Sequence, residues 1–131
     1  MAENTKKTYV IDASYVLNFL MPDEQSVISD AIFEQYKNRQ IDLISVSLLP
    51  FEVYNSLNAA IIRKRLKNEE AIKLLKFFDK LKIQYTEINF PKAFKTCIKY
   101  NLSYYDASYL YLSKHFHYPL LSLDKHLLKY N

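Results

Sequence analysis

Segments with the pattern of β-strands alternate with segments of helical periodicity along this chain, and this alternation limits the possible folds more than any other feature. Short runs rich in β-branched and aromatic residues predict strands at 8–12, 41–46, 82–88 and 119–123. Helices are predicted at 14–21, 25–37, 48–66, 69–81, 91–100, 104–115 and 125–130. Strands separated in this way by helices imply a parallel sheet that is covered on both faces.

The helix ends carry residues that favour particular caps. Ser14 is expected to cap the first helix and Asn68 the helix at 69–81, since both side chains can accept hydrogen bonds from free amides. Asn101 is expected to end the helix at 91–100 in a left-handed conformation, because the chain has no glycine. Two inner faces are predicted from helical spacing: Val27, Ile28, Ala31, Ile32 and Phe33 in one helix, and Ile72, Leu75, Phe78 and Leu81 in another.

Length and composition indicate a single domain over residues 1–131, with residues 1–7 as a polar, flexible N-terminal tail. The lone Cys97 excludes a disulfide within the chain, and no apolar segment of signal-peptide or transmembrane length is found, so we expect a cytoplasmic protein. The absence of glycine excludes the glycine-rich phosphate loops of nucleotide-binding proteins.

Four acidic residues, Asp12, Glu52, Asp106 and Asp124, lie far apart in the sequence, each in or beside an apolar stretch. Asp12 and Asp124 close the first and last predicted strands, and Glu52 and Asp106 lie early in helices that follow connections from the same edge of the sheet. Because parallel strands end at one edge of a sheet, folding would bring all four together. Each also has a local explanation as a helix cap or as a charge at the positive end of a helix.

Four carboxylates at one edge would repel each other and raise some of their pKa values unless a cation lay between them. Mg²⁺ or Mn²⁺ is the simplest candidate, since hard ions prefer oxygen ligands. Without these four acids the net charge of +4 becomes 18 − 10 = +8, so a basic body could surround an acidic centre. Such a distribution suits an enzyme that acts on a polyanion, although a lysine-rich composition explains the basic charge equally well.

Four motifs in order resemble those of the PIN-domain family, and most closely its VapC-type toxin ribonucleases. They are Val10-Ile11-Asp12-Ala13-Ser14, Pro50-Phe51-Glu52-Val53-Tyr54-Asn55-Ser56-Leu57, Tyr105-Asp106-Ala107-Ser108-Tyr109-Leu110, and Ser122-Leu123-Asp124, in which serine replaces the family's usual threonine. The resemblance covers essentially the whole chain. It implies a three-layer α/β/α sandwich with a central, mostly parallel sheet of four to five strands.

The resemblance also implies an activity, namely metal-dependent hydrolysis of RNA that leaves a 5′-phosphate and a 3′-hydroxyl. Asp12 and Asp106 would be the main ligands of Mg²⁺ or Mn²⁺, Glu52 would bind through water or orient the attacking water, and Asp124 would complete the site. Three further residues are candidates for holding these carboxylates or waters: Ser14, Asn55 and Ser122. VapC-like proteins are held inactive by a cognate antitoxin and commonly form homodimers, so both partners are expected.

Other features allow two interpretations. Arg63, Lys64, Arg65 and Lys67 could contact RNA phosphates or form a solvated helix end. Tyr104 and Tyr105 could stack on bases, but twelve tyrosines favour core packing. The helices starting near Ser14 and Leu48 carry more apolar residues than one core face needs, which suggests a partner surface: Tyr15, Leu17, Phe19, Leu20, Val53, Tyr54 and Leu57.

Competing classes explain the acids less well. A haloacid-dehalogenase-like phosphatase needs a second aspartate where this chain has Ser14, and a receiver domain needs adjacent acids at the first strand. A PIN-like module that binds RNA or a protein without cleaving is the remaining alternative. A binder of polyanions, however, gains nothing from carboxylates gathered in its groove.

Overall fold

A computed structural model describes residues 6–24 and 27–131 of the chain, and the following elements lie within them. In order they are β1 (Lys7–Ile11), α1 (Ala13–Leu20), α2 (Val27–Lys37), β2 (Ile41–Val46), α3 (Leu49–Ile62), α4 (Asn68–Lys80), β3 (Gln84–Thr86), α5 (Phe90–Tyr100), α6 (Tyr104–Phe116), β4 (Leu120–Leu121) and α7 (Lys125–Leu128).

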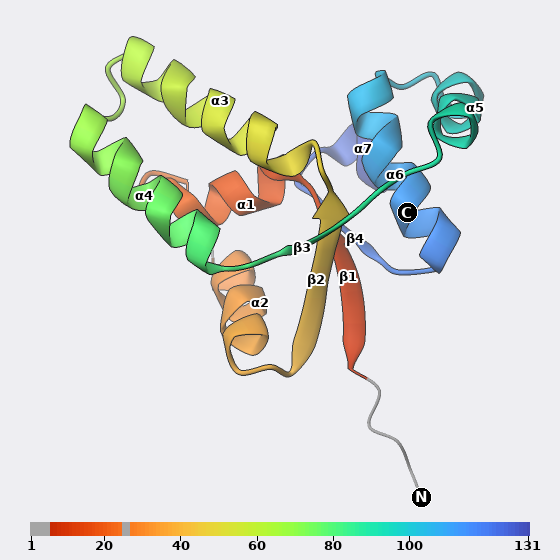
Figure 1. Cartoon of the computed structure of the whole chain (residues 1–131), viewed down its shortest axis with the longest axis horizontal. Helices are drawn as coiled ribbons and strands as arrows, with labels where there is room; N and C mark the ends of the chain where they lie inside the picture. The colour runs from red at the N-terminus through yellow and green to blue at the C-terminus, as the bar shows by residue number, and fades with distance from the viewer. Residues whose placement is uncertain (1–5, 25–26) are drawn as a thin grey trace, which may run out of the picture.

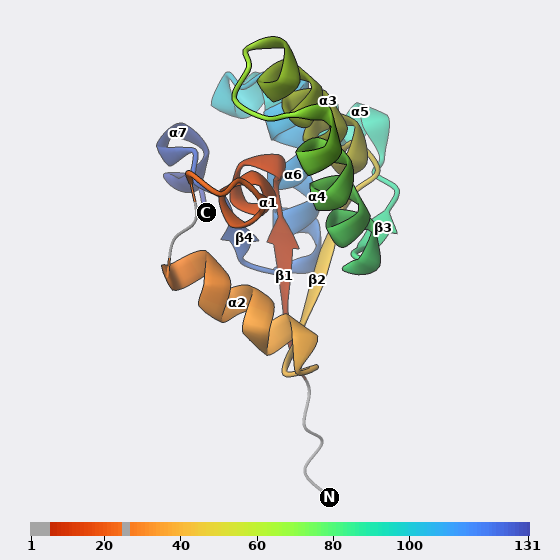
Figure 2. The ribbon, with the colours of Figure 1, turned by 90° about the vertical axis from the view of Figure 1, so that its left-hand side faces the viewer.

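The strands form one sheet in the order β3-β2-β1-β4, and every pairing within the described residues is parallel. Helices α1 to α4 lie on one side of the sheet and α5 and α6 on the other, which gives three layers (Figure 1). The view at right angles shows α1 to α4 in front of the sheet and α6 behind it (Figure 2). The predicted α/β/α sandwich with four to five strands is therefore confirmed, with a sheet that is parallel throughout.

The chain order reverses between β1 and β4. From β1 the chain adds β2 and then β3 on one side, and β4 returns to pair with the other side of β1. Such a reversal leaves a crevice beyond the carboxyl ends of the two strands at which it occurs, here β1 and β4, and open α/β folds bind their ligands in such a crevice. Asp12 and Asp124 both follow strands at this point.

The core lies between the sheet and its two helical layers. Five of the six residues of β2 are buried, as expected of a strand covered on both faces. The inner side of α3 buries four residues at helical spacing: Leu49, Val53, Leu57 and Ala60. This packing fixes α3 against α1 and thereby fixes the position of its first turn, which carries Glu52.

Several predicted helix starts were wrong by one or two residues. The cap of α1 is Asp12, whose side chain accepts a hydrogen bond from the amide of Tyr15, and Ser14 lies inside the helix. Asn68 is the first residue of α4, and the carboxylate of Glu70 accepts from the amide of Lys67. Asn101 does end α5 in the left-handed region, at φ 52°.

Exposed apolar residues correct the predicted inner faces of α2 and α4. Val27 and Ile28 are 84% and 74% exposed, whereas α2 buries Phe33, as predicted, together with Ser29. Ile72 is 53% exposed, whereas Phe78 is buried as predicted, together with Ala71. The prediction that α2 begins at residue 25 concerns residues 25–26, which lie outside the described ones.

The ends of the sheet also differ from prediction. β1 begins at Lys7, so this residue of the expected tail pairs with Ile41, whereas residues 1–5 lie outside the described part. β3 and β4 have only three and two residues, because few of their backbone groups reach a neighbouring strand. No helix in the described ranges is long and apolar enough to cross a membrane.

Candidate active site

The four acidic residues lie beyond the carboxyl ends of the strands. Asp12 directly follows β1, and Asp124 follows β4 after a short connection. Glu52 lies in the first turn of α3, which follows β2, and Asp106 lies in the first turn of α6. Electrostatic effects link these carboxylates, since Asp106 acts on both Asp12 and Glu52 and is itself affected by Asp124. Folding therefore brings the four predicted acids to one region.

Asp12 is the most deeply buried of the four, with 5% of its surface exposed. Its Oδ1 accepts hydrogen bonds from the Ser14 hydroxyl at 2.6 Å and from the Tyr15 amide at 3.1 Å. Its Oδ2 accepts from the Ser122 hydroxyl at 2.5 Å. A carboxylate oxygen has two acceptor positions, so Oδ1 is saturated and Oδ2 keeps one for a further partner.

Ser14 and Ser122 tie this carboxylate to both ends of the sequence. The Ser14 hydroxyl also accepts from the amide of Leu123 at 2.9 Å, and the Ser122 hydroxyl accepts from the amide of Asp124 at 3.0 Å. The two hydroxyls lie 3.3 Å apart. Each serine hydroxyl thus donates to Asp12 and accepts from a backbone amide in the connection between β4 and α7. These hydrogen bonds hold that connection beside Asp12.

Glu52 is held by Tyr109, a residue for which the sequence pattern predicted no role of its own. The hydroxyl of Tyr109, on α6, donates to Oε1 of Glu52 at 2.5 Å across 57 residues of sequence. The Tyr109 side chain is buried, and burial together with the Glu52 carboxylate raises its pKa far above the ordinary tyrosine value. Tyr109 therefore stays protonated and serves as a permanent donor to Glu52. Its position three residues after Asp106, on the first turns of one helix, was the only signal in the sequence.

Asp106 and Asp124 are partly exposed, and both also have capping interactions nearby. Ser103 caps α6 and accepts from the Asp106 amide at 3.1 Å. Asp124 caps α7, and its Oδ1 accepts from the amides of His126 and Leu127. The structural explanation of Asp124 is thus observed, while the Asp106 carboxylate caps no helix in the described part of the chain.

Burial is the main cause of the raised pKa values in this region. Burial raises the pKa of Asp12, and the hydrogen bonds from Ser122, Ser14 and Tyr15 partly offset this increase. Burial raises the pKa of Glu52 as well. The hydrogen bond from Tyr109 lowers this pKa, while the charges of Asp106 and Asp12 raise it further. The pKa of Asp106 is raised by burial and then by Asp124. Negative charge at this edge is therefore costly, and a cation would relieve that cost.

The donor set fits a hard divalent cation. All candidate ligands are carboxylate oxygens, which Mg²⁺ and Mn²⁺ prefer, and Asp12 Oδ2 retains an acceptor position. No three His, Cys, Asp or Glu side chains of the described residues are gathered closely enough to ligate one ion directly. Mg²⁺ does not need three, because it commonly keeps several waters and binds through one or two carboxylates.

Asn55 and the basic cluster make no side-chain hydrogen bond or ion pair with the four acids in the described part of the chain. Asn55 is exposed on α3, and its side chain makes no hydrogen bond to any described residue. The basic cluster of Arg63, Lys64, Arg65 and Lys67 lies in and around the α3–α4 connection. Arg63 follows Glu52 by eleven residues, or roughly 16 Å along the α3 axis.

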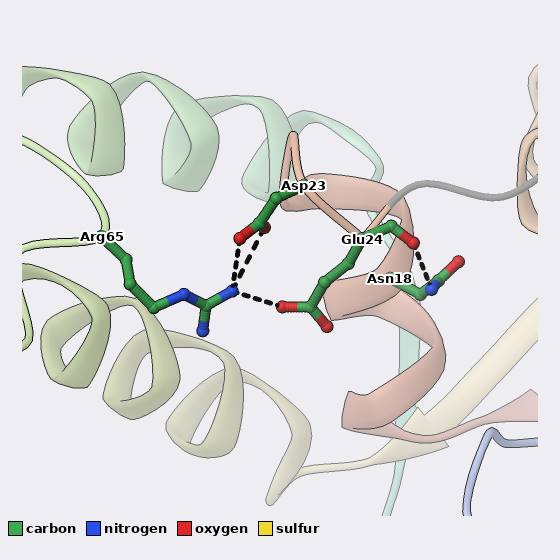
Figure 3. Close-up of polar contacts among 4 residues, drawn as sticks. All are labelled: Asn18, Asp23, Glu24 and Arg65. Atoms are coloured by element: carbon green, nitrogen blue, oxygen red, sulfur yellow. Dashed lines mark hydrogen bonds and ion pairs between the residues drawn. The ribbon is translucent and has the colours of Figure 1, made fainter.

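Arg65 is already paired with acids. Its Nη2 donates to both carboxylate oxygens of Asp23 and to Oε2 of Glu24 at 2.9–3.1 Å, while Asn18 donates to the Glu24 carbonyl (Figure 3). The contacts of Arg65 with Asp23 and Glu24 connect the α3–α4 turn to the segment after α1. The Arg65 guanidinium also lowers the pKa of Asp23. An RNA phosphate would have to compete with two carboxylates for Arg65.

An all-parallel sheet with a group of carboxylates at its switch point is the arrangement expected of the PIN class. The family model for the PIN domain matches residues 9–131. The chain therefore belongs to the PIN-domain family.

Two relatives show how far the likeness extends. The chain is 31% identical over 123 residues to Ribonuclease VapC3 of Pyrobaculum aerophilum, and the match covers 90% of each chain. It also resembles the crystal structure of PAE2754 from Pyrobaculum aerophilum, with a TM-score of 0.77 and 21% identity. That match covers 95% of this chain and 80% of the other, and at this identity it supports the fold alone.

Proposed function

We propose that this protein is a metal-dependent endoribonuclease that hydrolyses RNA phosphodiester bonds and acts as the toxin of a toxin-antitoxin pair. The observation that carries the proposal is the Asp12 carboxylate, buried at the carboxyl end of β1. Asp106 is close enough to raise the pKa of Asp12, and Asp12 is close enough to raise the pKa of Glu52. The likeness to a ribonuclease of the VapC group supports RNA as the substrate.

Asp12 and Asp106 would hold the Mg²⁺ or Mn²⁺ ion, with Asp124 adjusting the charge beside Asp106. The bound ion would supply Lewis acidity toward the phosphodiester. Glu52 would accept the proton of the attacking water through Oε2, since Tyr109 occupies Oε1 and no described residue donates to Oε2. Its raised pKa suits a general base, which works best when its pKa approaches the working pH. Ser14 and Ser122 would keep Asp12 in place by their hydrogen bonds.

Tyr109→Phe is expected to slow cleavage by about 10- to 100-fold in kcat with little change in KM, because Glu52 loses the donor that fixes its orientation. Single-turnover cleavage of a short RNA measures this. The matched control is Tyr111→Phe on the same helix, since the Tyr111 hydroxyl has no hydrogen bond to a described residue. Full activity in Tyr109→Phe would rule out this positioning role, and equal losses in both variants would point to a general effect on α6.

The proposed partners are RNA, a cognate antitoxin and a second copy of the chain, all in the cytoplasm. Most apolar residues that the sequence pattern assigned to a partner surface lie in the core instead, including Tyr15, Leu20, Val53 and Leu57. Exposed apolar residues occur on α5, where Phe94 and Ile98 are 53% and 67% exposed and lie one turn apart. This face supports the homodimer, because residues four apart form a continuous apolar stripe.

The direct test is incubation of the purified protein with cellular RNA in Mg²⁺, in Mn²⁺ and in EDTA, followed by mapping of the new ends. We expect cleavage with either metal, none in EDTA, and recovery when metal is added back. The new ends should carry 5′-phosphates. A folded protein that binds RNA tightly but leaves it intact with both metals would favour the alternative, a PIN-like module that binds RNA or protein without catalysis.

A further inference from the structure

A hollow of about 380 Å³ lies at the carboxyl ends of β2 and β3, outside the group of acids. The end of β2 and its connection to α3 form one wall through Val46 and Leu48. The connection from β3 to α5 forms another through Ile88 and Phe90, and the first turns of α6 form the third through Tyr104 and Tyr105. Pockets for small organic ligands start at about 300 Å³, so the hollow suits a group the size of one nucleotide.

Two aromatic residues at the hollow are exposed and available for stacking. Tyr105 is 60% exposed and Phe90 is 69% exposed, which corrects the expectation that Tyr105 packs in the core. Tyr104 is less exposed and better fixed, because its hydroxyl donates to the Phe90 carbonyl at 3.1 Å and its ring lies 6.4 Å from that of Phe94. Flat rings that remain in contact with water at a pocket mouth are what base stacking requires.

Three polar side chains at the hollow have no partner among the described residues: Ser47, Thr86 and Glu87. Hydroxyls can donate or accept, whereas a carboxylate only accepts. A carboxylate at the rim repels phosphate, but it accepts hydrogen bonds from the amino and imino groups of a nucleobase. The chemistry of the hollow therefore favours a base and disfavours the phosphate of the same strand.

The hollow and the acids share two helices. Tyr105 precedes Asp106 on α6, and Ser108, which also lines the hollow, follows it by two residues. On α3, the backbone amide of Glu52 donates to the carbonyl of Leu48, which lines the hollow one turn earlier. Neighbouring residues on a helix point about 100° apart, so each helix can present one face to the hollow and the next face to the acids.

We propose that this hollow binds one unpaired nucleobase of the RNA strand whose phosphodiester lies at the acids. Tyr105 stacks on the base, and Glu87 accepts hydrogen bonds from its edge. The inference rests on the proposed ribonuclease activity for its substrate, and it adds a base preference near the cleaved bond. It also restricts the substrate to RNA in which that base is free to leave a helix.

Binding without cleavage is the first test. A fluorescent, unpaired RNA heptamer is titrated into the Asp12→Asn protein with Mg²⁺ present, and its polarisation is followed. Adding Tyr105→Ala, which removes the stacking ring, or Thr86→Trp, which fills the hollow, should weaken binding about tenfold. Tyr111→Ala, on the same helix but away from the hollow, is the matched control and should leave the affinity unchanged.

Base preference is the second test. Cleavage sites of the wild type and of Glu87→Gln are mapped on a pool of random RNA in Mg²⁺. We expect the wild type to favour one base next to the cut bond, and the variant to relax or change that preference. An unchanged preference would overturn the role of Glu87.

The outcomes separate this inference from the proposed activity. Unchanged heptamer affinity in both Tyr105→Ala and Thr86→Trp overturns the base site, whether or not the wild type cuts RNA. Weakened affinity in both with an uncleaving wild type upholds the base site and refutes the nuclease. If both variants instead turn a dimer into a monomer in analytical ultracentrifugation, the hollow belongs to an interface between copies and the base site is wrong.

Discussion

Asp12→Asn is expected to lower the rate of RNA cleavage by on the order of 10³-fold or more while the protein remains folded. Asp12 is the most buried acid of the site, and its Oδ2 keeps one acceptor position beyond the Ser122 hydrogen bond. Asparagine removes the negative charge that would bind the cation. Its amide oxygen can still cap α1, since asparagine and aspartate are comparable N-caps.

The choice of asparagine separates catalysis from folding. Asp12→Ala would also remove the hydrogen bond from the Tyr15 amide and would cost roughly 0.5–2 kcal/mol of stability, so its inactivity would be ambiguous. Cleavage assays should be paired with circular dichroism and thermal unfolding of the same samples. Cleavage at the wild-type rate by a folded Asp12→Asn protein would remove Asp12 from the site.

Asp106→Asn is expected to cause a comparable loss of activity and, in the absence of metal, to stabilise the protein at neutral pH. The pKa of Asp106 is raised in the folded protein, mainly by burial and then by the charge of Asp124. The folded state therefore opposes ionisation of this group, and a neutral asparagine avoids that cost. A site that requires a charge for function commonly reduces stability.

The sign of the pH dependence follows from linkage. A carboxyl group with a raised folded pKa binds its proton more tightly when folded, so the free energy of unfolding decreases as pH rises from the unfolded pKa through the folded one. The wild type should thus lose stability relative to Asp106→Asn as pH rises through that interval, and the difference should then stay constant up to neutral pH. Below the ordinary carboxyl range both groups are uncharged, and the difference should vanish.

Urea unfolding of the wild type and of Asp106→Asn at several pH values, in EDTA, measures this difference. Asp42→Asn is a suitable control, because Asp42 is exposed in the sheet and outside the acid site. Addition of Mg²⁺ should stabilise the wild type more than the variant, since only the wild type offers the full set of carboxylates. A wild type that is more stable than Asp106→Asn in EDTA at neutral pH would contradict the repulsive environment assigned to this residue.

The structural role of a residue was predictable from the sequence where that role depends on its neighbours along the chain. The strand Ile41–Val46 was predicted with its observed limits, because five of its six side chains enter the core and the sequence shows an apolar run. The left-handed end of α5 at Asn101 was predictable for a similar local reason. The positions of the four acids, after strands or early in helices, predicted that they would lie near one another, because parallel strands end at the same edge of the sheet.

Roles that depend on distant contacts were not predictable. Tyr109 reaches Glu52 across 57 residues, and its position three residues after Asp106 does not by itself reveal that contact. Arg65 was compatible with either a phosphate ligand or a solvated helix end, whereas in the folded chain it pairs with Asp23 and Glu24. Ile72 has the spacing of a core residue, but it is 53% exposed, and α4 buries Ala71 and Phe78. Tertiary packing, which a sequence pattern does not contain, decided each case.

The hydrogen bonds between Asp12 and the serines also set the order in which activity can arise during synthesis. Ser14 is made immediately after Asp12, but Ser122 follows 110 residues later. At about 5–20 residues per second, the ribosome needs roughly 5–20 s to make that interval. Until β4 docks, Asp12 lacks its Oδ2 donor and Asp124 is not beside Asp106. Under the proposed ribonuclease function, a nascent chain would therefore lack the complete site needed to cut the message that encodes it.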